Sequence, residues 1–178
     1  MAGVVGDKIR LWEYIPGKWN GEVAAEMYRN PMKKVLAKHR ALKKIWTIVE
    51  DNDPAGFKSS KARAAKKEVG MKELSLPPYS PDLNPLDFTL WRTIETRARE
   101  SVGKRTLTVK EYKATLRRTA LRLSAKIVGK AVEGMWGRIG RVFHAEGGNI
   151  KREWVHASVC VCVEIRSDVV IAVACPPW

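Results

Sequence analysis

The sequence lacks the features that signal a secreted or membrane protein. Its few cysteines, Cys160, Cys162 and Cys175, all lie close to the C-terminal end, so they form no disulfide framework spread over the chain. The N-terminus has no basic segment followed by an apolar stretch, as a secretory signal would have. The apolar runs VCVCV and VVIAVAC are separated by charged residues and are too short to span a bilayer. We therefore expect an intracellular protein without a membrane segment.

The cysteines also give little indication of a metal site. Cys160 and Cys162 would lie on the same face of a strand, but with only His156 nearby they match no common zinc spacing. Small buried side chains are the simpler interpretation.

Acidic residues are scarce relative to basic ones. The 178 residues include 33 Lys and Arg against 19 Asp and Glu, a net charge of +14. The excess is densest over residues 101–153, with 13 basic and 4 acidic residues, whereas residues 154–178 carry 1 and 2. This balance favours a polyanionic partner, most simply nucleic acid, although a ribosomal-type or membrane-surface protein would share it. A hydrophobic content of 45% is enough for a packed core.

The first half of the chain has an α/β pattern. Residues 3–15 predict a hairpin, residues 20–40 a helix capped by Asn20 and interrupted by Pro31, and residues 45–49 a short buried strand. A helix that begins after Ser59 or Ser60 and stops at Gly70 precedes a second strand over 72–76. A strand, a helix and a strand joined by short loops predict a parallel βαβ unit.

A proline-rich stretch, SLPPYSPDLNPLDFTLW, then leads into another helix. Asn84 suits the N-cap position and Pro85 the first helical position, where its missing N–H has no cost. Asp87 follows at the third position and faces the positive end of the helix dipole. The prolines stiffen the leader and fix where this helix begins.

A further helix begins at the capping box Thr108–Glu111 and carries an apolar stripe that we extend to Ile127. On another face of this helix, Arg118, Arg122 and Lys126 recur every four residues. These three side chains are either a solvated surface or a DNA phosphate-binding face.

Two carboxylates stand out by position. Asp51 follows the buried strand, at the edge where open α/β sheets bind ligands, and Asp87 lies on the first turn of the proline-led helix. The crossover between them returns the chain to the same edge, so the two carboxylates can meet there. Paired carboxylates on a basic protein suggest Mg²⁺ bound for phosphodiester chemistry. In the alternative interpretation, Asp51 satisfies loop amides and Asp87 the helix dipole.

Two segments resemble the catalytic blocks of mariner-superfamily (DDE-type) transposases. EDNDPAGFKSSKA resembles the second block, in which a strand ends in an Asp-Asn pair and a proline follows. PPYSPDLNPLDFTLW resembles the third block, in which Ser-Pro-Asp-Leu-Asn-Pro precedes a catalytic Asp or Glu and then Leu-Trp. The spacing of the two acidic positions also suits the superfamily, and the resemblance extends from about Val4 to Ile150.

The resemblance implies a ribonuclease H-like fold and metal-dependent DNA cleavage and strand transfer with Mg²⁺ or Mn²⁺, in the nucleus or otherwise inside the cell. Asp51 matches the second catalytic acid and Asp87 the third, and both would be metal ligands. The expected supporting residues, in order of the chain, are Asn52, Asp82 and Asn84; Asp53 is a second-choice ligand and Glu95 a less favoured one.

The sequence departs from the family pattern at its beginning. The family's first catalytic acid lies on the first, central strand of the sheet, but only 50 residues precede Asp51 here. Asp7 falls in the turn of the hairpin, from which a side chain projects away from the sheet. We therefore expect an incomplete ribonuclease H-like α/β fold followed by basic C-terminal helices, inactive as this chain alone. The family's helix-turn-helix DNA-binding region is absent as well.

Residues 1–101 are expected to form the partial catalytic domain, and residues 102–150 its basic helical C-terminal part. The apolar tail, 151–178, either fills the gap left by the first strand or is foreign sequence. Three functions remain open: a transposase fragment that binds DNA, a non-catalytic basic nucleic-acid-binding module, and a multimerisation fragment that acts as a homo-oligomer or with a full-length transposase.

Overall fold

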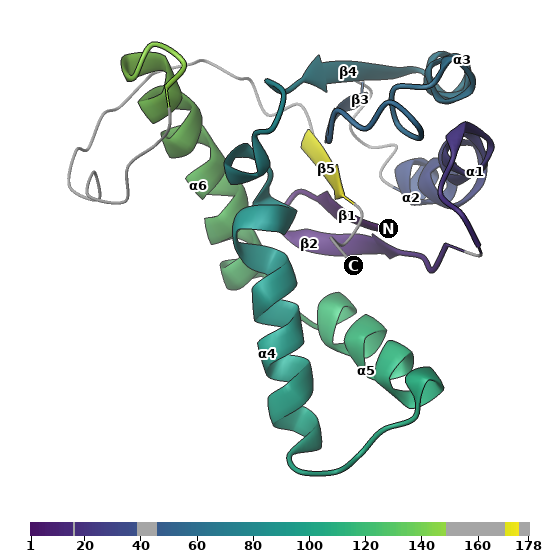
Figure 1. The fold of residues 1–178 in the computed structure, drawn as a ribbon, viewed down its shortest axis with the longest axis vertical. Coiled ribbons are helices and arrows are strands. Elements are labelled where there is room, and N and C mark those ends of the chain that lie inside the picture. Colours follow the sequence, from purple (N-terminus) through teal and green to yellow (C-terminus); the bar gives the residue numbers. More distant parts are fainter. Residues whose placement is uncertain (16, 39–45, 149–169, 175–178) are drawn as a thin grey trace.

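The computed structural model describes residues 1–15, 17–38, 46–148 and 170–174. These residues form a five-stranded sheet in the order β2-β1-β5-β3-β4, with helices on both faces (Figure 1). None of the helices within these ranges is long and apolar enough to cross a membrane. The cysteines at 160, 162 and 175, and His156, lie outside the described residues.

The hairpin at the start of the chain is confirmed. β1 (Ala2–Val5) pairs with β2 (Lys8–Trp12) in antiparallel fashion. The turn between them uses Gly6, whose φ of +61° suits a residue without a Cβ. Lys8 and Arg10 of β2 are exposed, whereas Ile9 and Leu11 are buried in the cores of opposite faces, because the β1–β2 ladder is irregular between Gly3 and Val4 and Arg10 is left without a partner residue.

The predicted βαβ unit is also confirmed, with boundaries shifted by about one residue. β3 (Trp46–Glu50) and β4 (Met71–Ser75) are parallel, and α3 (Ser60–Val69) connects them. The Ser59 side chain caps α3 by accepting a hydrogen bond from the amide of Ala62. The helix stops at Gly70, whose φ of 78° places it in the left-handed region.

The helix predicted over 20–40 consists of three pieces. α1 (Gly21–Met27) is capped by Asn20, as expected, and α2 (Lys33–Lys38) continues in the same direction. Between them Tyr28–Met32 forms a π-helical turn that contains Pro31. A proline has no amide hydrogen to donate to the preceding turn, and the wider π turn accommodates it without ending the helix.

The C-terminal tail supplies the central strand of the sheet. β5 (Val170–Ala174) lies between β1, to which it is antiparallel, and β3, to which it is parallel. β5 occupies the centre of the sheet, the position for which the sequence predicted either an open gap or a strand supplied by the tail. The backbone groups of β1 and β3 that an open gap would leave unpaired therefore have partners.

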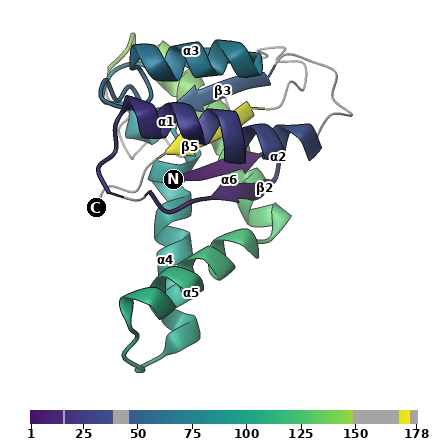
Figure 2. The same cartoon turned by 90° about the vertical axis from the view of Figure 1, so that its right-hand side faces the viewer.

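The proline-rich segment and the helices after it cover the second face of the sheet. A 3₁₀ turn (Pro81–Leu83) and a π-helical turn (Leu86–Leu90) lead into α4 (Trp91–Val102). α5 (Val109–Leu121) then returns along α4, and both project from the sheet as an arm (Figures 1 and 2). The capping box of Thr108 and Glu111 is present as predicted.

The single helix expected to run through Ile127 is instead two helices. α5 ends at Leu121, and α6 (Ala125–His144) begins after Ser124. Arg122 at the end of α5 has left the helical region at ψ 0°, and Ser124 is extended at ψ 146°. The two helices have matching apolar spacing and so give the period of one long helix, because the period alone does not reveal a short break.

Each face of the sheet has its own core. α1, α2 and α3 cover one face, where Tyr28, Phe57 and Ile48 are among the fully buried side chains. On the other face α4, α5 and α6 pack against β1 and β2, with Leu90, Ile94 and Trp12 among the contacts. Successive residues of a strand point to opposite faces. The last residues of β3 therefore present their side chains alternately to the two helical layers.

Candidate active site

The structure brings Asp51 and Asp87 together at the carboxyl end of β3. Asp51 is the first residue after that strand, and Asp87 lies on the first turn of the helix that follows the prolines. The two carboxyl groups lie close enough to affect each other's pKa. Both line one cleft of about 320 Å³, together with Asn52, Leu76, Pro77, Tyr79, Ser80 and Pro81.

Asn84 positions both Asp51 and Asp87. Its side-chain oxygen accepts a hydrogen bond from the amide of Leu86 (3.1 Å), and its backbone carbonyl accepts one from the amide of Asp87 (2.9 Å), so it caps the helix as predicted. Its side-chain nitrogen donates to Asp51 Oδ1 at 3.0 Å. Asn84 is fully buried. One residue therefore both starts the helix that carries Asp87 and binds the carboxylate of Asp51.

Trp91 provides a contact that sequence reasoning missed. Its indole nitrogen donates to Asp87 Oδ1 at 3.1 Å, and its ring packs edge-on against Trp12 at 5.5 Å between centroids. The Leu-Trp pair of the third block was noted only as part of a motif. Its spacing of four residues from Asp87 on a helix was the available signal, since such residues lie on the same side.

Both carboxyl groups have a raised proton affinity, chiefly because they are buried. Burial is the largest cause that raises the pKa of Asp87, to about 7, and the negative charge of Asp51 adds to it against the Trp91 hydrogen bond. Burial also raises the pKa of Asp51, which the hydrogen bonds from Asn84 and Asp87 oppose. Two carboxylates in a partly buried cleft need a proton or a cation between them.

The other acidic candidates lie elsewhere or are already occupied. The Asp53 carboxylate accepts hydrogen bonds from Trp19 Nε1 (2.7 Å) and from the amides of Ala55 and Gly56, so it closes the loop after β3. Glu95 forms an ion pair with Arg99 along α4. Asp82 lies in the 3₁₀ turn, where its carbonyl oxygen is 3.4 Å from Arg138.

Asn52 and Asp7 are placed as the sequence suggested. The Asn52 side chain donates to the carbonyl of Leu76, which ties the loop after β3 to the segment after β4. Asp7 is exposed in the hairpin turn. Val5 of β1 and Ile48 of β3 both pair with Ile171 of β5, and β1 runs antiparallel to β3. The hairpin turn therefore lies at the amino end of β3, whereas Asp51 lies at its carboxyl end.

The basic residues expected on one helix face are divided between two helices. Arg118 and Arg122 line a groove of about 560 Å³ together with Arg97 of α4, whereas Lys126 lies in the first turn of α6 and is not part of it. The predicted stripe of Arg118, Arg122 and Lys126 is therefore wrong as a single face, because α5 ends before it. Arg97 was missed because only the antiparallel return of α5 along α4 brings it close.

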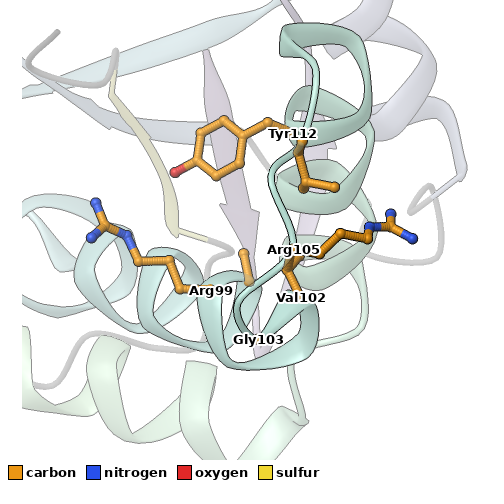
Figure 3. Close-up of a pocket in the computed structure, with 7 residues that line it drawn as sticks. Arg99, Val102, Gly103, Arg105 and Tyr112 are labelled. Carbon is orange, nitrogen blue, oxygen red and sulfur yellow. The ribbon is translucent and has the colours of Figure 1, made fainter.

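A second pocket, of about 520 Å³, lies at the tip of the arm (Figure 3). The guanidinium groups of Arg99 and Arg105 point away from each other there. Arg99 donates to Glu95 at 2.6 Å, and Arg105 lies 3.8 Å from Glu111. Because both arginines already have carboxylate neighbours, this pocket offers less positive charge to a ligand than the groove does.

A buried charge network, also missed from the sequence, lies on the opposite face of β3. Lys66 donates to Glu50, to Glu73 (2.6 Å) and to the carbonyl of Phe57 (3.0 Å). The Tyr28 hydroxyl donates to Glu50, and Lys58 pairs with Glu73. Glu50 and Lys66 are both buried. Nothing in a sequence pattern of alternating strands predicts that a lysine of α3 reaches a glutamate of β3.

The donor set at Asp51 and Asp87 fits one hard divalent ion. Carboxylate oxygens are the ligands that Mg²⁺ prefers, and this ion keeps waters and phosphate oxygens for its remaining positions. Within the described ranges no group of three or more His, Cys, Asp or Glu side chains comes close enough to hold a metal. The pair is therefore a two-carboxylate site.

No family model and no curated protein matches the sequence, but the structure is similar to solved transposase structures. With the Mos1 transposase catalytic domain, solved with raltegravir and Mn, the TM-score is 0.70 at 17% identity, over 84% of this chain and 76% of that one. With the Mos1 mariner paired end complex with Mn, the TM-score is 0.69 at 17% identity, over 84% and 44% of the two chains. With the Mos1 strand transfer complex it is 0.63 at 16% identity, over 84% and 43%.

Similarity at this level of identity shows the fold. The α/β architecture is that of the Mos1 catalytic domain, which is ribonuclease H-like, and the fold class expected from the sequence is confirmed. β5 takes the central place in the sheet of this chain.

Proposed function

We propose that this chain is a mariner-like DDE transposase or endonuclease domain, in which Asp51 and Asp87 bind a divalent cation and the arm binds DNA. The single observation that carries the proposal is the convergence of the two carboxyl groups in one cleft at the carboxyl end of β3. The fold shared with the Mos1 catalytic domain supports it. Mg²⁺ or Mn²⁺ is the cation that we assign, since the neighbouring structures were solved with these metals.

The chemistry follows from what the residues hold. A bound Mg²⁺ or Mn²⁺ would supply Lewis-acid stabilisation of a phosphodiester oxygen. Asp51 and Asp87 supply its two negative ligands, Asn84 keeps Asp51 in place, and Trp91 orients Asp87. Two carboxylates hold one ion, whereas clamping both the attacking and the leaving oxygen takes two. We therefore expect the 178-residue chain to bind metal and DNA without cutting the strand.

The DNA partner is assigned from charge. Three arginines, Arg97, Arg118 and Arg122, and one carboxylate, that of Glu100, line one groove of the arm. Within the described part of the chain the three arginines form no ion pair, so the groove keeps a net positive charge. Each cation that contacts a phosphate releases a counterion, so binding by such a groove weakens as salt rises. The neighbours solved as paired end and strand transfer complexes support this partner and assembly with further transposase chains. We assign a nuclear site of action because the proposed partner is DNA.

The experiment measures the affinity for duplex DNA with Mg²⁺ or with a chelator. We expect Mg²⁺ to strengthen binding by the unmodified chain, and Asp51→Asn or Asp87→Asn to remove that increment while leaving the metal-independent binding intact. Glu95→Gln, which removes a surface carboxylate of α4, is the matched control and keeps the increment. If Mg²⁺ has no effect but the chain still binds DNA, it is a non-catalytic nucleic-acid-binding module.

The arm is tested separately by salt dependence. Arg97→Ala, Arg118→Ala and Arg122→Ala combined should reduce the slope of log affinity against log salt by up to about 3, because each phosphate contact contributes about 0.9. Lys33, Arg63 and Lys67, exposed on α2 and α3, are changed to alanine as the control of equal charge. Equal slopes for the two triple variants would mean that the groove is only a solvated surface.

A further inference from the structure

Tyr79 is an aromatic residue without packing partners, held at the rim of the carboxylate cleft. It lines the same cleft as Asp51 and Asp87, yet its side chain is fully exposed, at 101%. Its φ is +53°, in the left-handed region. Within the part of the chain that the structure describes, its side chain makes no hydrogen bond, ion pair or ring contact. The ring therefore contributes nothing to the core.

The backbone at Tyr79 is unfavourable for this residue type. A bulky residue rarely adopts a positive φ, and such strain is found where the surrounding structure imposes it, often at ligand sites. Here the surroundings are stiff: Pro77 and Pro78 precede Tyr79, and the Ser80 hydroxyl donates to the carbonyl of Pro78 at 3.2 Å. The prolines and this bond fix the direction in which the ring leaves the chain.

The dimensions of the cleft limit what the ring can meet. About 320 Å³ is the lower end of the range of small-molecule sites, which is room for a group the size of one nucleotide and too little for a base pair. A phosphodiester that reaches Asp51 and Asp87 therefore brings a nucleotide whose base is not stacked within a duplex. An exposed aromatic ring stacks on any base, since every base has a π-face.

We propose that Tyr79 is a positioning residue that stacks on an unpaired nucleobase of the DNA strand whose phosphate lies at Asp51 and Asp87. This inference rests on the proposed function, because it assigns the ligand of the same cleft. It also gives the proline-rich leader a second role: the leader fixes the helix that carries Asp87 and aims the ring that holds the strand.

The test uses the full chain and a duplex with a short single-stranded end that contains 2-aminopurine, a fluorescent base that stacking quenches. The unmodified chain should quench the fluorescence and bind this DNA more tightly than the blunt duplex of the same sequence. Tyr79→Ala should weaken binding to the single-stranded end about tenfold and abolish the quenching, since base–aromatic stacking contributes about 1–3 kcal/mol per base. Its affinity for the blunt duplex should not change.

Two further variants keep the result interpretable. Tyr79→Phe retains the ring and should behave as the unmodified chain. Phe143→Ala removes another exposed aromatic residue, one that does not line the cleft, and should have no effect. Melting temperatures should agree across the set, because the Tyr79 ring packs against nothing.

Equal affinities of Tyr79→Ala and the unmodified chain for the single-stranded end would overturn the proposal, as would a loss in Tyr79→Phe as large as that in Tyr79→Ala. Failure of the proposed function would give a different experimental result. In that case Mg²⁺ would not strengthen DNA binding, and Asp51→Asn and Asp87→Asn would not differ from the unmodified chain, whatever Tyr79→Ala does.

Discussion

Glu50 and Asp51 are consecutive residues at the end of one strand, yet their surroundings are electrostatically opposite. Glu50 points to the α1–α3 face, where it is fully buried and Lys66 and Tyr28 donate to it. Asp51 lies on the other face, where its neighbours are the amide of Asn84 and a second carboxyl group, Asp87. The pleat of the strand places two acids of similar chemistry in two different layers.

The difference separates a structural carboxylate from one suited to a ligand. On the first face the protein supplies its own cations. Burial raises the pKa of Glu50, but the charge of Lys66 and the hydrogen bonds from Lys66 and Tyr28 oppose the rise, and hydrogen bonds from Lys58 and Lys66 lower the pKa of Glu73 below its ordinary value. On the second face no cation contributes to the pKa shifts of Asp51 and Asp87, and both pKa values are raised. Two carboxylates that have no cationic side chain beside them can bind a cation from solution.

The largest effect is expected from breaking the structural network. Lys66→Met leaves Glu50 buried without its cation and should lower the free energy of unfolding by about 3–5 kcal/mol, measured by urea denaturation. Lys61→Met is the matched control, because its pair with Glu22 is exposed at 60% and 72%, and solvent screening leaves such pairs with little effect on stability. Equal losses for the two variants would mean that the network does not stabilise the fold as described.

A smaller loss is expected from Asn84→Ala. The change removes a helix cap, which costs about 0.5–2 kcal/mol, and it deprives Asp51 of a hydrogen-bond donor. Asn84→Asp keeps the cap but adds a third carboxylate beside the pair, so it should restore helix stability only at low pH, where the carboxylates are protonated. Thermal unfolding at pH 5 and pH 8 distinguishes the two variants, and identical profiles would contradict the role given to Asn84.

The smallest effect is expected from the titration of Asp87, which makes the stability of the fold depend on pH. Burial and the charge of Asp51 raise the pKa of Asp87 from its ordinary value of 3.8 to about 7 in the folded state. Between these values the folded chain holds a proton that the unfolded chain has lost, so stability falls as pH rises through about 7. Asp87→Asn removes this titration. It should match the unmodified chain near pH 4 and melt a few degrees higher at pH 8, without metal, whereas a constant difference would show that Asp87 does not titrate in this range.

Local patterns predicted much of the fold. The caps at Asn20, Ser59 and Thr108 and the stop at Gly70 are where the sequence placed them, because each satisfies backbone groups within a few residues. The break between α5 and α6 was missed for the opposite reason, since no proline or glycine marks it. The position of β5 at the centre of the sheet was left open, because pairing over such a separation is decided by the rest of the sheet.

The features of the candidate site likewise divide into those that the sequence predicts and those that it does not. The convergence of Asp51 and Asp87 follows from the βαβ crossover, which the sequence shows. The contact of Trp91 with Asp87 follows from their spacing of four residues along one helix. The place of Arg97 in the groove depends on how α4 and α5 pack, and the network around Lys66 depends on side chains that reach across a layer. Neither the groove position of Arg97 nor the network around Lys66 has a local signal in the sequence.

The most direct test of the central claim is the effect of Mg²⁺ and Mn²⁺ on the free energy of unfolding at pH 8. A cation that binds only the folded chain stabilises it by about 2.7 kcal/mol at a hundredfold excess over its dissociation constant. We predict this stabilisation for the unmodified chain and for Glu95→Gln, and its loss in Asp51→Asn and in Asp87→Asn. Equal stabilisation of all four proteins, or none in the unmodified chain, would contradict the assignment of this carboxylate pair as the metal site.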